Sequence, residues 1–406
     1  MKVKNCRSCN SQNIDKALDL GKMKLTGVFP KDREDKISSG KISLMMCSNC
    51  SLLQLEYSFN HSEMYGDNYG YMSSLNKSMI EHLKNKANNL KNITKLDPGD
   101  IVVDIGSNDG TFLSFFEKKY TLIGIDPTIK KFLGKYRKDI FTIADFFSYE
   151  ILRKKIKKKA KLITSIACFY DLENPIKFVE DVYNSLDDNG LWHLEQSYMP
   201  AMIKNMSYDT ICHEHLEYYS LKSLKFILDK VGFKIINIEL NSINGGSFAL
   251  TVAKNRSFFA TDNNSVDWLL NKEQMFKYNN ITTIKNFATN VAKQKKLLSD
   301  LIKNLIDMKK KVLGYGASTK GNVILQYCKI NEKIIPYIGE VNTFKFNRFT
   351  PGTNIKILSE KKIKSMKPDY LLVLPWHFRN FIVDKEKKFS KDGGKFIFPL
   401  PDIEII

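Results

Sequence analysis

The sequence lacks any apolar run long enough to cross a membrane, since a transmembrane helix needs about 20 consecutive apolar residues. The first residues, Met-Lys-Val-Lys-Asn-Cys, also lack the hydrophobic stretch of a signal peptide. We therefore expect a cytoplasmic protein with no membrane partner. Hydrophobic residues still make up 43% of the 406 residues, which is enough for substantial cores, and this length predicts two or three domains.

Acidic residues are scarce relative to basic ones. The sequence has 44 Asp and Glu against 63 Lys and Arg, a formal net charge of +19. Such an excess is typical of nucleic-acid-binding proteins. The lysines, however, are scattered or stand in short runs such as residues 153–159, which favours solvated surfaces. We therefore do not expect nucleic acid as a partner, whereas an anionic ligand such as a sugar nucleotide is compatible with this charge.

A dinucleotide-binding fingerprint is also missing. A strand is predicted at residues 101–103, and the turn over residues 104–110 reads Asp-Ile-Gly-Ser-Asn-Asp-Gly. This spacing differs from the G-x-G-x-x-G that brings a pyrophosphate to a helix N-terminus. We expect the acid inside the turn, Asp109, to face the ligand, where it would repel a pyrophosphate but suit a sulfonium cation. The turn therefore favours S-adenosylmethionine (SAM) over a nicotinamide dinucleotide, with an ordinary turn without ligand as the alternative.

The residues expected to bind SAM lie at the ends of three predicted strands. An acid ends the apolar run 121–125, about 20 residues after the glycine-rich turn, where a ribose diol is hydrogen-bonded in such folds. The third strand ends in an acid that could reach the adenine amine. The candidates are Asp104, Gly106, Asn108, Gly110, Asp126 and Asp145.

The remaining pattern completes the α/β layout of a class I, Rossmann-like methyltransferase domain, a doubly wound sheet ending in a hairpin. We expect Ser223 to cap the helix that precedes Gly232. Further strands are predicted at 162–166, 191–196, 233–236 and 247–252, and helices at 79–90, 111–116, 175–182 and 224–231.

Four of the seven cysteines form two Cys-x-x-Cys pairs, Cys6 with Cys9 and Cys47 with Cys50. In a cytosolic protein this arrangement favours a tetrahedral zinc site over disulfides. The zinc is expected to be structural, because four thiolates leave no open coordination position. The segment between the pairs is too short and too polar for a substantial core, so we expect the metal to hold about the first 60 residues together.

An aromatic segment follows this module. Tyr65, Tyr69 and Tyr71 stand close together and could line the opening above the methyl donor or pack a connection between domains. The two interpretations have equal support, and we include the tyrosines among the candidate substrate residues.

Two of the six histidines lie within three residues, in His213-Glu214-His215. They are not spaced four apart as in the helical metalloprotease motif. In an extended chain both imidazoles would face one side, and we expect a histidine general base oriented by a carboxylate, close to the methyl donor. A metal site or a packed polar loop are the alternatives.

The last third repeats the strand, glycine-rich turn and helix pattern at residues 311–322, after a long amphipathic stretch over 284–305. Backbone amides, hydroxyls and an ammonium group could cradle a diphosphate there. We take this as the sugar-nucleotide site, with a ligand-free packing domain as the alternative. The candidate residues are Gly316, Ser318, Thr319, Lys320, Asn322, Lys345 and Arg348.

The order of these motifs, with His-Glu-His-Leu-x-Tyr-Tyr-Ser in the middle domain, resembles the sugar-nucleotide C-methyltransferases of deoxysugar pathways over the whole chain. The resemblance implies that His215, beside Glu214, removes the proton next to the carbonyl of a keto sugar. It also implies that the third domain helps to hold the nucleotide sugar. We place the zinc module and aromatic connector at 1–75, the SAM domain at 76–260, and the connector helix with a Rossmann-like α/β domain at 261–406.

Two positions depart from that family. Cys212 stands where a tyrosine is usual, and Ala167-Cys168-Phe169-Tyr170 lacks the histidine often found there. Both changes remove polar groups that could stabilise an enolate. We therefore predict SAM-dependent methylation of a nucleotide sugar for a surface glycan by a monomer or weak dimer, with C-methylation preferred. A sugar O-methyltransferase and, more remotely, a zinc-containing RNA-binding methyltransferase are the alternatives.

Overall fold

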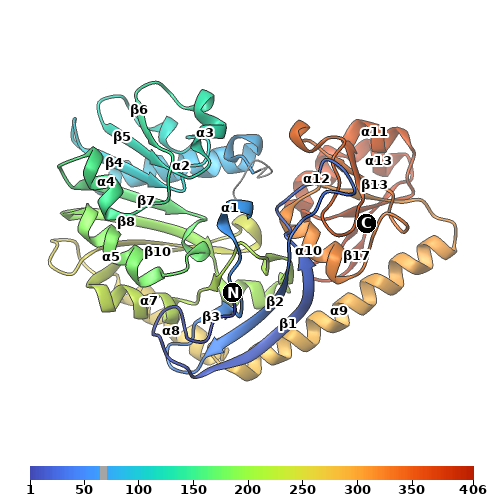
Figure 1. Cartoon of the computed structure of the whole chain (residues 1–406), viewed down its shortest axis with the longest axis horizontal. Helices are drawn as coiled ribbons and strands as arrows, with labels where there is room; N and C mark the ends of the chain where they lie inside the picture. Colours follow the sequence, from blue (N-terminus) through green and yellow to red (C-terminus); the bar gives the residue numbers. More distant parts are fainter. Residues whose placement is uncertain (65–70) are drawn as a thin grey trace.

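The computed structural model describes residues 1–64 and 71–406, and the strands of this described part form three sheets of four, seven and six strands. Figure 1 shows the seven-stranded sheet on the left and the six-stranded sheet on the right. The two longest N-terminal strands run along the lower edge of the molecule beside a long helix. No helix in the described part is long and apolar enough to cross a membrane.

The seven-stranded sheet has the order β10-β11-β8-β7-β4-β5-β6, with a parallel centre and an antiparallel hairpin at one edge. This is the class I methyltransferase arrangement expected from the sequence. The strands are β4 (Ile101–Ile105), β5 (Thr121–Ile125), β6 (Ile140–Ile143), β7 (Ala160–Ile166), β8 (Leu186–Ser197), β10 (Phe233–Asn241) and β11 (Ser247–Lys254).

Helices cover both faces of this sheet, because alternate residues of a buried strand point to opposite sides. Val102 belongs to the apolar cluster under α2 (Lys77–Thr94), whereas its neighbour Val103 belongs to the cluster under the helices of the other face. Those helices are α4 (Tyr149–Lys155), α5 (Pro175–Ser185), α7 (Leu221–Val231) and α8 (Asn263–Met275). Shorter helices are α1 (His61–Met64), α3 (Ile129–Phe132) and α6 (Met199–Lys204).

Two helix predictions need correction. The segment after the glycine-rich turn forms only a short 3-10 helix, Leu113–Phe115, because Phe116 already has an extended backbone. The helix before Gly232 begins at Leu221, and its cap is Ser220, whose hydroxyl accepts a hydrogen bond from the Ser223 amide. Ser223 is instead the third helical residue and completes the capping box.

The N-terminal sheet has the order β1-β2-β3-β9, with β1 (Ile14–Lys24), β2 (Ser39–Cys47), β3 (Leu53–Leu55) and β9 (Glu217–Tyr218). Its last strand therefore comes from the middle of the chain. Leu18, Leu20 and Leu44 are buried in one apolar cluster with side chains of the C-terminal third. The expectation that this module has no substantial core is wrong, since its long strands share a core with the rest of the protein.

The six-stranded sheet has the order β14-β13-β12-β15-β16-β17. The connector helix is α9 (Ile281–Asp307), whose Phe287 and Leu298 are buried in the shared cluster. The strands are β12 (Val312–Tyr315), β13 (Tyr337–Glu340), β14 (Lys356–Ser359), β15 (Tyr370–Val373), β16 (Lys395–Phe398) and β17 (Glu404–Ile405). The helices are α10 (Thr319–Tyr327), α11 (Glu360–Ser365), α12 (Arg379–Lys385) and α13 (Lys387–Lys391).

Candidate active site

A cavity of about 210 Å³ opens where the parallel strands β4, β5 and β8 end. Ligands of doubly wound sheets bind at this edge. Six acidic residues line the cavity: Asp104, Asp126, Asp145, Asp171, Glu173 and Glu195. So many carboxylates in one cavity favour a cationic ligand.

The glycine-rich turn forms the floor of the cavity. Gly106 has a φ of +75°, and a β carbon there would lie 2.9 Å from the Cβ of Cys168, so no larger residue fits. The main-chain amide of Asn108 donates to the Asp126 carboxylate at 2.9 Å, and the Thr128 amide donates to it at 2.6 Å. The ends of β4 and β5 are thereby tied together around the cavity.

Asp104 is buried at the end of β4 and accepts a hydrogen bond from the Thr164 hydroxyl at 2.6 Å. Burial raises the pKa of Asp104 to about 7, and the nearby charge of Asp126 adds to this rise, while the Thr164 hydrogen bond opposes it. The carboxyl therefore titrates near neutral pH. A cation bound in the cavity would favour its ionised form.

Two residues of the turn have roles other than those predicted. Asp109 is only 2% exposed and accepts hydrogen bonds from the Ser74 amide at 3.0 Å and the Thr111 hydroxyl at 2.6 Å, so the prediction that it faces the ligand is wrong. A β carbon at Gly110 would lie 2.7 Å from the Tyr136 ring. Gly110 therefore makes room for this ring behind the turn and does not line the cavity.

Of the three candidate tyrosines, Tyr71 lines the cavity, and its carbonyl accepts a hydrogen bond from the Asn108 side chain at 3.4 Å. The Ser73 amide donates to the same side chain at 3.0 Å. Tyr65 and Tyr69 lie outside the described residues. The segment before α2 is thus anchored on the glycine-rich turn.

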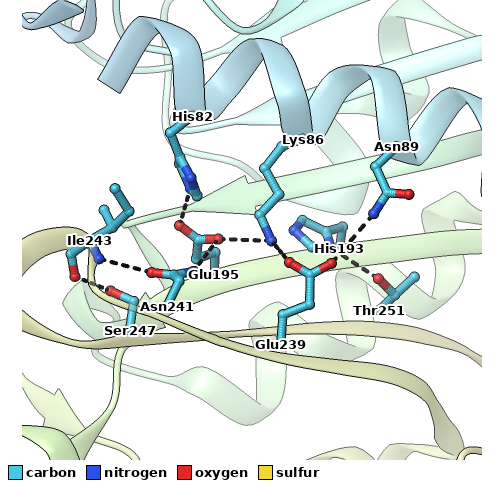
Figure 2. A network of polar contacts seen from close by, with 10 residues as sticks. All are labelled: His82, Lys86, Asn89, His193, Glu195, Glu239, Asn241, Ile243, Ser247 and Thr251. Carbon is cyan, nitrogen blue, oxygen red and sulfur yellow. Dashed lines mark hydrogen bonds and ion pairs between the residues drawn. The ribbon is translucent and has the colours of Figure 1, made fainter. Parts of the chain in front are cut away.

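A polar network that we did not predict surrounds Glu195, at the end of β8 (Figure 2). The His82 ring nitrogen lies 2.6 Å from one carboxylate oxygen, and the Lys86 ammonium lies 3.1 Å from the other. These two partners lower the pKa of Glu195 although burial raises it, so the carboxylate stays ionised beside the cavity. Figure 2 shows that Lys86 also reaches Glu239, with which it forms a second ion pair. The sequence signal that could have indicated this network is the spacing of His82 and Lys86, which are four residues apart and so lie on one face of α2.

The histidine loop does not place its two imidazoles on one side. His213 packs edge-on against Phe59, with ring centroids 4.6 Å apart, whereas His215 packs on Tyr170 at 4.3 Å. The chain bends at His213 and Glu214, which breaks the expected alternation. His213 therefore packs next to the N-terminal sheet, on a different ring from His215, and we do not retain it as a catalytic candidate.

Glu214 does not orient His215 either. Its buried carboxyl accepts a hydrogen bond from the Thr26 hydroxyl at 3.4 Å, and burial raises its pKa. The Nδ1 atom of His215 lies 2.8 Å from the Thr210 carbonyl, which acts only as an acceptor. His215 is thus held with Nδ1 protonated and Nε2 as the basic nitrogen.

Lys320 connects the third domain with both the loop and the cavity. Its ammonium donates to the Asn244 carbonyl at 2.7 Å, and Asn244 lines the cavity. Burial, and then the charge of Lys320, lower the pKa of His215 to about 3, so this imidazole is neutral at physiological pH. Trp376 fixes the neighbouring Asp209 through a 2.8 Å hydrogen bond.

The other residues of the predicted diphosphate cradle contact the chain itself. Asn322 is fully buried, and its side-chain amide donates to the Thr26 carbonyl at 2.7 Å. The Arg348 guanidinium donates to the Phe29 carbonyl at 2.9 Å. Residues 26–29 therefore lie over the second glycine-rich turn. The turn at which we predicted a diphosphate cradle is thus covered by the N-terminal segment.

The remaining cradle residues are engaged locally. The Ser318 hydroxyl caps α10 by accepting from the Gly321 amide at 3.0 Å, and the Lys345 ammonium donates to the Ala317 carbonyl at 2.7 Å. A β carbon at Gly316 would collide with Pro375, and Thr319 lies beside Gly27 of the covering segment. These groups stabilise the turn instead of facing an open site.

The four predicted zinc ligands come together. The Sγ atoms of Cys6 and Cys50 are 3.5 Å apart, as are those of Cys9 and Cys47, and all four lie within 4.8 Å of one another. Tetrahedral Zn–S bonds of about 2.3 Å place sulfurs about 3.8 Å apart, whereas a disulfide needs about 2.05 Å. The arrangement fits a zinc ion held by four thiolates, and all seven cysteines are free of disulfides.

Comparisons with known proteins agree with a zinc-binding segment followed by a methyltransferase domain. Three family models match in succession: a putative zinc-binding domain at residues 6–65, a methyltransferase domain at 79–238 and a C-methyltransferase C-terminal domain at 242–401. Together these matches support a SAM-dependent C-methyltransferase. The C-methyltransferase NovU of Streptomyces niveus is 27% identical over 100% of this chain and 97% of its own length.

This C-methyltransferase also shows likeness to solved structures. The plantazolicin methyltransferase BpumL is 16% identical with a TM-score of 0.34, over 43% of this chain and 84% of its own. A SAM-dependent methyltransferase from Clostridium acetobutylicum is 12% identical with a TM-score of 0.36, over 43% and 92% of the two chains.

SAM fits the acidic cavity of the C-methyltransferase, and it is the methyl donor. Its sulfonium supplies an electrophilic methyl group. The cavity's carboxylates complement its positive charges, and the side chain missing at Gly106 leaves room for it above Cys168.

Proposed function

We propose that this C-methyltransferase methylates a carbon of a nucleotide-activated keto sugar, with His215 as the base that removes the proton beside the carbonyl. The observation that carries the proposal is the state of His215, whose Nδ1 is held by the Thr210 carbonyl at 2.8 Å. Its low pKa keeps the ring neutral, so Nε2 is an available proton acceptor at neutral pH. The product would serve a surface glycan.

The charge of Lys320 supports carbon as the methylated atom. Removing a proton beside a carbonyl moves an electron pair onto the carbonyl oxygen, and the enolate needs a cation or a hydrogen-bond donor. Cys212 and the Ala167–Tyr170 loop lack the usual polar groups, but the half-buried ammonium of Lys320 acts on His215 from the third domain. The enolate would in turn favour protonated His215, which offsets the low pKa of the free ring.

The nucleotide part of the acceptor has weaker structural support. Segment 26–29 covers the turn at which we expected the diphosphate. We therefore place the acceptor beside the contact of Lys320 with Asn244 at the cavity wall, where a cation from the third domain is available. The excess of basic residues, a net charge of +19, favours an anionic acceptor in general.

The test uses purified protein, SAM, and thymidine- or uridine-diphosphate 4-keto-6-deoxyhexoses, each paired with the nucleotide sugar that lacks the keto group. Mass spectrometry should detect one added CH₂ only on keto sugars, and NMR should place it on carbon. His215→Asn keeps a side-chain donor for the Thr210 carbonyl but no base, so turnover should fall about 100-fold or more. Calorimetry should show unchanged SAM affinity. Methylation of the sugars without a keto group would refute the proposal.

A further inference from the structure

The strand that follows His215 belongs to the zinc-binding sheet. In β9, Glu217 and Tyr218 pair with Gln54 and Leu53 of β3. The amide of Leu55 also donates to the carbonyl of Leu216 at 2.8 Å, one residue after the candidate base. Main-chain hydrogen bonds therefore continue from the sheet almost to His215.

The second pair of zinc ligands sets the start of β3. Cys47 ends β2, and Cys50 lies three residues before Leu53. The Cys47 amide donates to the Leu52 carbonyl at 2.9 Å, and the Ser51 amide donates to the Cys47 carbonyl at 3.0 Å. A metal bound by Cys47 and Cys50 would fix this tight turn and hence the strand on which β9 is paired.

The first pair of ligands reaches β9 through Arg7, which stands between Cys6 and Cys9. The Arg7 amide donates to the Gln54 side chain at 2.8 Å, and its guanidinium donates to the Leu55 carbonyl at 2.7 Å. The guanidinium Nε also lies 3.7 Å from the Glu217 carboxylate, and both side chains are at most 3% exposed. Burial raises the pKa of the Glu217 carboxyl, and removing the Arg7 guanidinium would leave this buried polar group without its neighbour, which is destabilising.

We infer that the zinc-binding segment positions the catalytic loop, with Arg7, Gln54 and Glu217 as positioning residues that connect the metal ligands to the strand after His215. The metal's effect would extend beyond local stability, because β3 lies between β2, which ends at the zinc ligand Cys47, and β9. Phe59, downstream of β3, adds a further contact to the loop by packing on His213. The catalytic meaning of this inference rests on the proposed role of His215, whereas the structural coupling does not.

The first experiment removes zinc from the intact protein with a chelator and follows amide hydrogen exchange by mass spectrometry. Exchange in residues 211–218 should become at least about tenfold faster, since it follows the free energy of local opening. Exchange in β4 and β5 and the Kd for SAM should stay within about twofold, because none of residues 1–60, all of which the structure describes, lines the donor cavity. Zinc release without faster exchange in 211–218 would overturn the inference.

The second experiment keeps the metal, so that global unfolding of the zinc-free protein would not obscure the result. Arg7→Met should retain bound zinc, measured by elemental analysis, but should still accelerate exchange in residues 211–218. Arg256→Met is the matched control, since Arg256 is 57% exposed and pairs with Asp188 far along the chain from the loop. Equal exchange in the two variants would also overturn the inference.

Activity separates the coupling from the proposed chemistry. With a keto-sugar probe that is turned over, Arg7→Met should lower kcat about tenfold while leaving the KM for SAM unchanged. Faster exchange at 211–218 with full activity would retain the coupling but remove the loop from catalysis, and would thus count against His215 as the base. If exchange at 211–218 is unchanged in Arg7→Met while His215→Asn loses activity, the role of His215 as the base is retained and the coupling to the zinc segment is rejected.

Discussion

The protein contains two glycine-rich turns after a buried parallel strand, and they differ in what lies above them. The turn after β4 opens on the acidic cavity, and its Gly106 and Asn108 line that cavity. The turn after β12 is covered by residues 26–29, to which Asn322 and Arg348 are hydrogen-bonded. A glycine-rich turn therefore shows where a chain reverses, whereas an open site also depends on which distant segment packs over it.

The local chemistry of the two turns differs accordingly. After β12 the chain enters the regular helix α10, and the Ser318 side chain already caps it. After β4 only a 3-10 turn forms, and the amide of Asn108 is directed to Asp126 across the strand ends. The first turn thus gathers acidic groups around a space, and the second uses its polar groups to attach the N-terminal segment.

The largest effect should come from breaking the first turn. Asp126→Ala removes the acceptor of the Asn108 and Thr128 amides and one negative charge of the cavity. Hydrogen bonds to charged groups contribute about 1.5–3 kcal/mol each, so the Kd for SAM should rise about 100-fold in calorimetry. Asn322→Ala, in the second turn, is the control and should change that Kd less than twofold. Equal SAM affinity in both variants would contradict the difference between the turns.

A substitution in the second turn should lower the stability of the folded protein without affecting SAM binding. Asn322→Ala leaves the Thr26 carbonyl without its buried donor, and the unfolding free energy should fall by about 2 kcal/mol in urea titrations. SAM affinity should not change. A variant of normal stability that binds nucleotide sugars poorly would instead return this turn to the role of a diphosphate site, so acceptor binding is measured alongside.

Sequence reasoning succeeded where the signal was local. The strand ending in Asp104, the turn at Gly106 and the acid at Asp126 follow from periodicity and spacing, and the cysteine pairs follow from their spacing. It failed where distant segments meet. Thr26 and Asn322 are 296 residues apart, and nothing near Asn322 indicates its partner. His213 and His215 likewise pack on Phe59 and Tyr170, two rings that lie far from them in the sequence.

The pH dependence of SAM binding should sharpen the description of the first turn. Because burial raises the pKa of Asp104 to about 7, its carboxyl is mostly neutral at pH 6 and mostly ionised at pH 8. A cationic donor favours the ionised form, so SAM affinity should rise up to about tenfold over this range, with proton release on binding. Calorimetry in buffers of different ionisation enthalpy measures both effects. Asp104→Asn should remove the pH dependence.

The raised pKa of Asp104 also predicts how the stability of the SAM-free protein depends on pH. Between pH about 4 and 7 the unfolded chain carries an ionised Asp104, whereas the folded protein keeps it protonated. The contribution of Asp104 to stability should therefore decline as pH rises through this window. Urea titrations of wild type and Asp104→Asn should converge at low pH and separate above it, with the variant relatively more stable at pH 7. A separation in the opposite direction would rule out a raised pKa.

The smallest effect should come from the network around Glu195, which borders the cavity without belonging to either turn (Figure 2). His82→Gln replaces the imidazole by an amide that can still donate a hydrogen bond to the carboxylate, while Lys86 still holds the other oxygen at 3.1 Å. Because Glu195 stays paired, SAM affinity should fall only about two- to fivefold. Asn89→Ala is the matched control, since its 3.4 Å contact with Glu239 is exposed to solvent and should not affect binding. A loss as large as that of Asp126→Ala would mean that Glu195, and not the first turn, dominates recognition of the donor.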